Sequence, residues 1–106
     1  MKVKTSELID GPLDWAVEVA EEMTVSQREF QPSTNWSQGG PIIGREIAKI
    51  ERFSDALWEA TAFTKNAQDI VQSGPTPLVA AMRCYVASKL GDEIEVPGEL
   101  GGDNEQ

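Results

Sequence analysis

The sequence predicts one small domain of the α+β class, in which helices surround a β-hairpin or small antiparallel sheet. A chain of 106 residues that is 40% hydrophobic suffices for one modest core. Apolar residues recur at helical spacing over 12–24 and 76–91. Residues 46–64 combine helix-type and strand-type residues, so the local pattern alone leaves a hairpin and a helix equally open.

The N-terminal part predicts a short turn followed by a helix. Residues 5–10 suit one capped helical turn that Gly11 would stop. Pro12 suits the first position of an amphipathic helix over about 12–24. Trp15 lies at the edge of its apolar arc, which favours a place at the rim of the core over the wall of a pocket.

Residues 35–46 predict a short helical segment broken by glycine. Asn35, with Gln38 three residues later, resembles a capping box. Gly39 and Gly40 indicate a tight turn or close backbone packing. They do not resemble a phosphate loop, because they lack a preceding strand and a following Gly-Lys-Ser/Thr. Further along, the polar stretch 65–73 indicates a loop or the end of a strand.

The last helix is the clearest element. Thr76 suits its N-cap, Pro77 its first turn and Gly91 its C-cap. A bulky apolar face and a face of small residues predict a central helix with neighbours on both sides. Arg83 in mid-helix would need a carboxylate, carbonyls or a ligand anion, and a structural salt bridge is the first expectation. Cys84, on the small face, is expected to be an inert filler.

Composition excludes many kinds of catalysis. The chain has no histidine and one cysteine, so His-based triads, disulfides within the chain and thiolate zinc sites are absent. We therefore expect no enzyme activity, catalytic residues, cofactor or metal site. The N-terminus lacks a signal-peptide apolar region, and no apolar run approaches the roughly 18 residues of a membrane span. A soluble protein in a reducing, intracellular setting without membrane contact is expected.

The net charge of −9 is concentrated near the C-terminus. Residues 92–106 hold six acids and no base, whereas the rest of the chain holds 12 acids and 9 bases. We therefore predict a domain over 1–91 and a flexible acidic tail over 92–106. The tail would aid solubility, mimic nucleic acid or dock on a basic partner. Direct nucleic-acid binding is disfavoured, because the basic residues are scattered.

Three segments, 1–8, 32–43 and 74–93, resemble the NinX-like family of small proteins of tailed phages and prophages. The family is a domain of unknown function, and the resemblance covers roughly residues 1–97. It implies a compact α+β domain, a hairpin within 46–64 that carries Trp58 on its second strand, and an accessory phage gene expressed in the host cytoplasm. The chain departs from the family pattern at Asn35 and Gly44, where relatives often carry acids.

Two main functional hypotheses follow. The favoured one is a non-enzymatic accessory protein that binds a host or phage protein. The alternative is a binder of a small nucleotide signal that counters host defence, since aromatic rings stack on bases and arginine pairs with phosphate. An acidic nucleic-acid mimic is a further alternative, and an exposed hairpin edge would allow a homodimer. The candidate ligand-binding or partner-binding residues are Trp15, Asn35, Trp36, Gly39, Gly40, Arg45 and Arg83.

Overall fold

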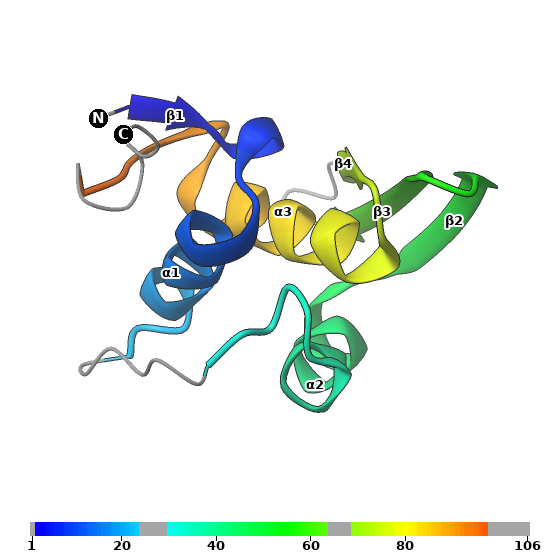
Figure 1. Cartoon of the computed structure of the whole chain (residues 1–106), viewed down its shortest axis with the longest axis horizontal. Helices are drawn as coiled ribbons and strands as arrows, with labels where there is room; N and C mark the ends of the chain where they lie inside the picture. The colour runs from blue at the N-terminus through cyan, green and yellow to red at the C-terminus, as the bar shows by residue number, and fades with distance from the viewer. Residues whose placement is uncertain (1, 24–29, 64–68, 98–106) are drawn as a thin grey trace.

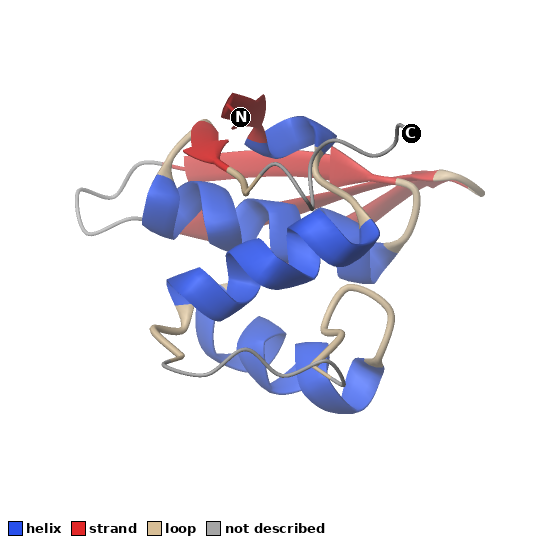
Figure 2. Ribbon diagram, turned by 60° about the vertical axis from the view of Figure 1, so that its left-hand side comes forward, coloured by secondary structure: helices blue, strands red, loops and turns tan. Residues whose placement is uncertain are grey.

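The computed structural model describes residues 2–23, 30–63 and 69–97 and has the α+β architecture that the sequence predicts (Figure 1). The strands gather on one side of the molecule and the helices on the other (Figure 2). In chain order, the elements are β1 (Lys2–Lys4), η1 (Thr5–Glu7), α1 (Asp10–Ala20), α2 (Trp36–Glu46), β2 (Lys49–Ser54), β3 (Leu57–Phe63), β4 (Asp69–Gly74), α3 (Pro77–Leu90) and β5 (Glu93–Glu95).

Helix α1 begins earlier than the sequence indicates. The turn expected at 5–10 is the 3₁₀ turn η1, but Gly11 lies inside α1 instead of stopping that turn. The chain turns sharply into α1 at Asp10, which has a positive φ of 52°. Asp tolerates this conformation better than most residues do. Leu13, Ala16 and Val17 are buried on α1, as its apolar arc predicts. The acids Asp14 and Glu18 are buried beside them, which the amphipathic pattern does not predict, and Val19 is 41% exposed.

Helix α2 is continuous, so the predicted break at its glycines is wrong. Gly39, Gly40 and Pro41 all lie inside the helix. Pro41 is on the exposed side, where water can satisfy the Ser37 carbonyl that proline leaves unpaired. Half of the predicted capping box is present, because the Asn35 side chain accepts a hydrogen bond from the backbone N–H of Ser37 at 2.9 Å. The other half is wrong, since Oε1 of Gln38 accepts from the backbone N–H of Gln31, and the Asn35 N–H donates to the Gln31 carbonyl.

The middle of the chain forms an antiparallel sheet in the order β2-β3-β4. The hairpin expected within 46–64 is confirmed, with its turn at 55–56 and Trp58 on β3. Of the two alternatives for 65–73, a loop or the end of a strand, the strand is confirmed for the described part, since β4 occupies Asp69–Gly74 and pairs with β3. Residues 64–68 lie outside the described residues.

Helix α3 is the central element of the core. It packs on β3 and β4 with one face and on α1 and α2 with others. Thr76 caps it by accepting from the backbone N–H of Val79 at 3.1 Å, and Gly91 ends it with φ 98°. The small face allows close approach to the sheet: a Cβ at Gly74 would lie 2.8 Å from the backbone nitrogen of Ala80. These caps and the two-sided burial are as predicted.

The predicted domain end at residue 91 is wrong. Strand β5 pairs antiparallel with β1, and it places Ile94 and Val96 in the core with 8% and 0% exposure. The register sets Lys2 opposite Glu95 and Lys4 opposite Glu93, so acids assigned to the tail face lysines across a strand pair. The rest of the predicted tail, 98–106, lies outside the described residues.

Candidate functional site

A groove of about 330 Å³ lies where the three helices begin. Trp36, the first residue of α2, is 55% exposed, and Ile9, immediately before α1, is 42% exposed. Both contribute to the walls, while Leu78 in the first turn of α3 is 4% exposed and contributes to the floor. The lining residues are Ile9, Asp10, Ser33, Thr34, Trp36, Pro75, Thr76, Pro77, Leu78 and Val79.

Local chain geometry explains why these side chains meet. The positive φ of Asp10 turns the chain into α1 directly after Ile9. The Asn35 cap starts α2 at Trp36, which leaves the indole at the helix end instead of on a packed face. Pro75 and Pro77 flank the Thr76 cap, and the fixed φ of proline holds this short connection from β4 into α3. The groove is thus built from helix starts.

The chemistry of the groove favours apolar contacts. Its walls are formed by indole, aliphatic and pyrrolidine groups, and hydroxyl groups come from Ser33, Thr34 and Thr76. Asp10 is the one charged side chain among the described lining residues. Because the described lining residues include no arginine or lysine, a site of this kind suits an apolar segment better than a phosphate.

Gly39 supports the groove from beneath. A Cβ at Gly39 would lie 2.5 Å from the carbonyl oxygen of Pro32 and 2.6 Å from Cδ2 of Leu78, so only glycine fits there without a shift. A Cβ at Gly40 would meet nothing within 4 Å. The close backbone packing that the sequence indicates for both glycines therefore applies to Gly39 alone.

Arg45 belongs to a cluster at the opposite end of α2. Its Nη2 lies 2.5 Å from Oε2 of Glu21, and its Nε lies 2.8 Å from Oε2 of Glu46. The nearly buried Tyr85 hydroxyl donates to the same Glu21 carboxylate, and burial raises the pKa of this phenol. The hydrogen bond with Glu46 and the charge of Glu21 raise the pKa of Arg45. Arg45 thus holds α1, α2 and α3 together instead of lining the groove.

Arg83 bonds to carbonyls, so the expected salt bridge is wrong. Its Nε donates to the Leu8 carbonyl at 2.7 Å, and its Nη1 donates to the Ser73 carbonyl at 2.8 Å. Partial burial lowers the pKa of this guanidinium. The side chain ties the segment before α1 to the end of β4, which is a structural role.

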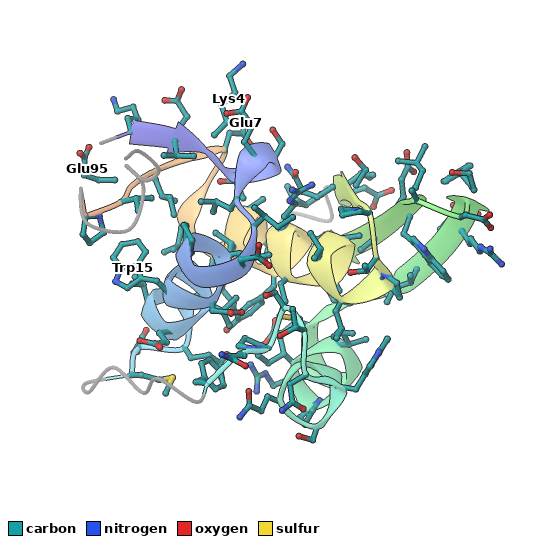
Figure 3. The ribbon with its side chains drawn as sticks, in the orientation of Figure 1. Lys4, Glu7, Trp15 and Glu95 are labelled. Carbon is teal, nitrogen blue, oxygen red and sulfur yellow. The ribbon has the colours of Figure 1, made fainter. Side chains whose placement is uncertain are left out.

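Trp15 and Cys84 are part of the core and its rim. Trp15 is partly buried against the core, and it lies on the side of α1 away from α2 (Figure 3). The buried Cys84 thiol donates to the Ile70 carbonyl at 3.1 Å, and burial raises its pKa to about 11. The thiol is therefore protonated at neutral pH, as expected of an inert filler.

The seven candidate residues do not form one site. Trp36 lines the groove, Asn35 positions it by capping α2, and Gly39 lies beneath it. The other four lie elsewhere, as described above. Sequence reasoning missed most of the lining residues, including Ile9 and Pro75. The helix-start signals at Thr76 and Pro77 were visible, but the convergence of three helix starts is a tertiary property that no local pattern carries.

Comparison with known proteins assigns the chain to a protein family. A search of curated proteins finds no match for this chain. The model of the family described as Bacteriophage P22, NinX, matches residues 4–89, which includes every element from η1 to α2 and the whole β2-β3-β4 sheet. No described helix is long and apolar enough to cross a membrane. Because the match spans well over half of the 106 residues, the chain belongs to the NinX family of bacteriophage P22.

Proposed function

We propose that this chain is a non-enzymatic phage accessory protein that acts in the host cytoplasm by binding a host or phage protein. The groove around Trp36 receives an apolar segment of that partner. The observation that carries the proposal is the 55% exposure of Trp36 inside a concave, largely apolar surface of about 330 Å³. Membership of a phage family supports the setting.

Exposed tryptophan in a groove is typical of binding surfaces. Tryptophan is enriched among the residues that dominate protein–protein affinity, and these residues lie in pockets where water is excluded on binding. Leaving a large apolar side chain in water costs free energy that a monomer avoids by burying it. Ile9 and Pro75 add further apolar surface to the groove that Trp36 lines. A partner segment in the groove would therefore contact several apolar side chains at once.

A nucleotide ligand has less support. Phosphate recognition relies on arginine or lysine, yet the described lining residues include neither. The two arginines considered for this role are engaged elsewhere, Arg45 with Glu21 and Glu46, and Arg83 with two backbone carbonyls. The described residues that line the groove beside Trp36 therefore offer no arginine or lysine to bind the phosphate of a nucleotide.

Cross-linking in infected cells tests the proposal. A tagged chain is expressed in phage-infected bacteria, cross-linked, purified and analysed by mass spectrometry as wild type, Trp36→Ala and Phe53→Ala. Phe53 is the matched control, since it is an exposed aromatic residue, at 57%, on the distant hairpin. We expect a protein that the wild type and Phe53→Ala enrich and Trp36→Ala does not. Equal enrichment by all three, or no enriched protein, would contradict the proposal.

A further inference from the structure

Strand β2 presents a free edge of the sheet. It lies at the outer margin of the sheet (Figure 1), and β3 is the one strand paired with it in the part of the chain that the structure describes. All of its residues except Ile50 are exposed. An unpaired strand edge is a template for adding another strand, which natural proteins either block or use.

The other outer strand, β4, has two backbone carbonyls that already accept hydrogen bonds from side chains of α3. The carbonyl of Ser73 accepts from Arg83, and the carbonyl of Ile70 accepts from Cys84, both on α3. The 3₁₀ turn η1 also contacts β4. Of the two outer strands, β2 is therefore the one available to a partner strand.

The charges of β2 complement a second copy of the same strand. Lys49 and Glu51 are exposed on one face of the strand, with 3.5 Å between Nζ and Oε1. In an antiparallel pair centred on Ile50, each Lys49 lies opposite Glu51 of the other copy. A pair centred on Lys49 or on Glu51 would instead set like charges opposite each other, which is unfavourable. The sequence of the strand thus selects one register.

Apolar contacts agree with the same register. Ile50 packs against the core, on the side of the sheet that α3 covers. Centred pairing brings the two Ile50 side chains together on that face, and it keeps both copies of α3 on one side of a continuous sheet. The irregular pairing between Arg52 and Ser54 ends the regular part of the strand, so the contact spans about residues 48–52.

We propose that two copies of this chain associate through antiparallel pairing of their β2 strands about Ile50. The resulting dimer has two-fold symmetry, in which the same patch serves both subunits. The surface is separate from the Trp36 groove, so the dimer leaves both grooves available to the partner.

Analytical ultracentrifugation over a micromolar to millimolar concentration series tests this. The wild type is expected to rise from the chain mass of 11.6 kDa toward twice that value. Lys49→Glu sets acids opposite acids and should lose the rise. The double variant Lys49→Glu/Glu51→Lys restores opposite charges in the same register and should recover it. Trp36→Ala should dimerise like the wild type, and matching melting temperatures show that the variants are folded.

Any of the following results of the ultracentrifugation would overturn the proposal. A wild type that stays at 11.6 kDa throughout the concentration series has no such dimer. Dimerisation that survives Lys49→Glu, or that the double swap fails to restore, does not use this register. A dimer that Trp36→Ala abolishes is formed by the groove, and β2 is then not the interface.

Discussion

At the scale of single residues, close packing decides which of the two adjacent glycines, Gly39 or Gly40, must be glycine for the chain to pack without a shift. Gly39 and Gly40 cannot be told apart by sequence pattern, since both are glycines in the same short segment. In the folded chain, a Cβ at Gly39 would meet Pro32 and Leu78, whereas a Cβ at Gly40 would meet nothing within 4 Å. The requirement for glycine therefore arises from a tertiary contact and not from the backbone conformation of α2.

Alanine substitution should separate these two glycines. Gly39→Ala forces Leu78 and the backbone at Pro32 to move, and overpacking of this kind costs about 1–3 kcal/mol. Gly40→Ala meets nothing and should stabilise α2 by up to about 1 kcal/mol, since alanine favours a helix more than glycine. Urea denaturation measures both. Equal destabilisation by the two substitutions would show that the close approach at Gly39 is not specific.

Asp14 should make stability depend on pH. It is 9% exposed and accepts a hydrogen bond from the backbone N–H of Ser33 at 2.9 Å, yet burial raises its pKa above the ordinary 3.8. Because the folded state holds this proton more tightly than the unfolded state, the contribution of Asp14 to stability falls as pH rises through the raised pKa. Asp14→Asn keeps an acceptor and removes the charge.

We therefore expect Asp14→Asn to be more stable than the wild type at neutral pH, with the difference vanishing in acid once Asp14 is protonated in both states. Urea denaturation at a series of pH values measures this. Asp55→Asn, at a turn residue with a 97% exposed side chain, is the control and should show little such trend. A pH-independent difference, or a less stable variant at neutral pH, would contradict the expected effect of burial.

At the scale of elements, the sequence predicts best where the signals are local. Thr76, Pro77 and Gly91 mark both ends of α3, because capping depends on residues within one turn. For 65–73 the sequence leaves a loop and the end of a strand open, because its polar residues favour a strand only weakly. The pairing with β3 decides in favour of the strand β4. The start of α1 at Asp10 was missed because Asp10 has a positive φ of 52°, which its local sequence pattern does not signal.

Arg83 should contribute to stability by joining elements. Arg83→Lys cannot reach both the part-buried Leu8 carbonyl and the exposed Ser73 carbonyl, so at least one of these acceptors loses its charged donor. Hydrogen bonds to charged groups contribute about 1.5–3 kcal/mol, and we expect a loss of this size in urea denaturation. Arg52→Lys is the control, since Arg52 has a 56% exposed side chain and should change stability by less than about 0.5 kcal/mol. Equal effects of both would argue against the bridging role.

At the scale of the whole molecule, the acidic C-terminus has two parts. The charge count alone predicts a tail from residue 92, but β5 continues the domain through Val96. A prediction from composition alone treats a run of acids as exposed to solvent. It overlooks the order of the residues, in which Ile94 and Val96 alternate with Glu93 and Glu95 as in a half-buried strand. Two of the six acids face lysines of β1.

Truncation should locate the end of the domain. A chain ending at residue 91 loses β5 and the buried Ile94 and Val96, and losing two such side chains should cost about 3 kcal/mol or more. A chain ending at residue 97 keeps both and should melt within a few degrees of the full chain. Thermal unfolding followed by circular dichroism measures both. Equal melting temperatures for the two truncations would show that β5 does not stabilise the domain.

The central claim is that the Trp36 groove is the partner-binding surface. Isothermal titration of the purified chain with the captured protein tests it most directly, using Trp36→Ala and Phe53→Ala as a matched pair. Residues that dominate an interface cost about 2 kcal/mol or more when truncated, so Trp36→Ala should weaken Kd by at least about tenfold. Phe53→Ala should leave Kd within about twofold. An unchanged Kd for Trp36→Ala, or an equal loss for Phe53→Ala, would contradict the claim.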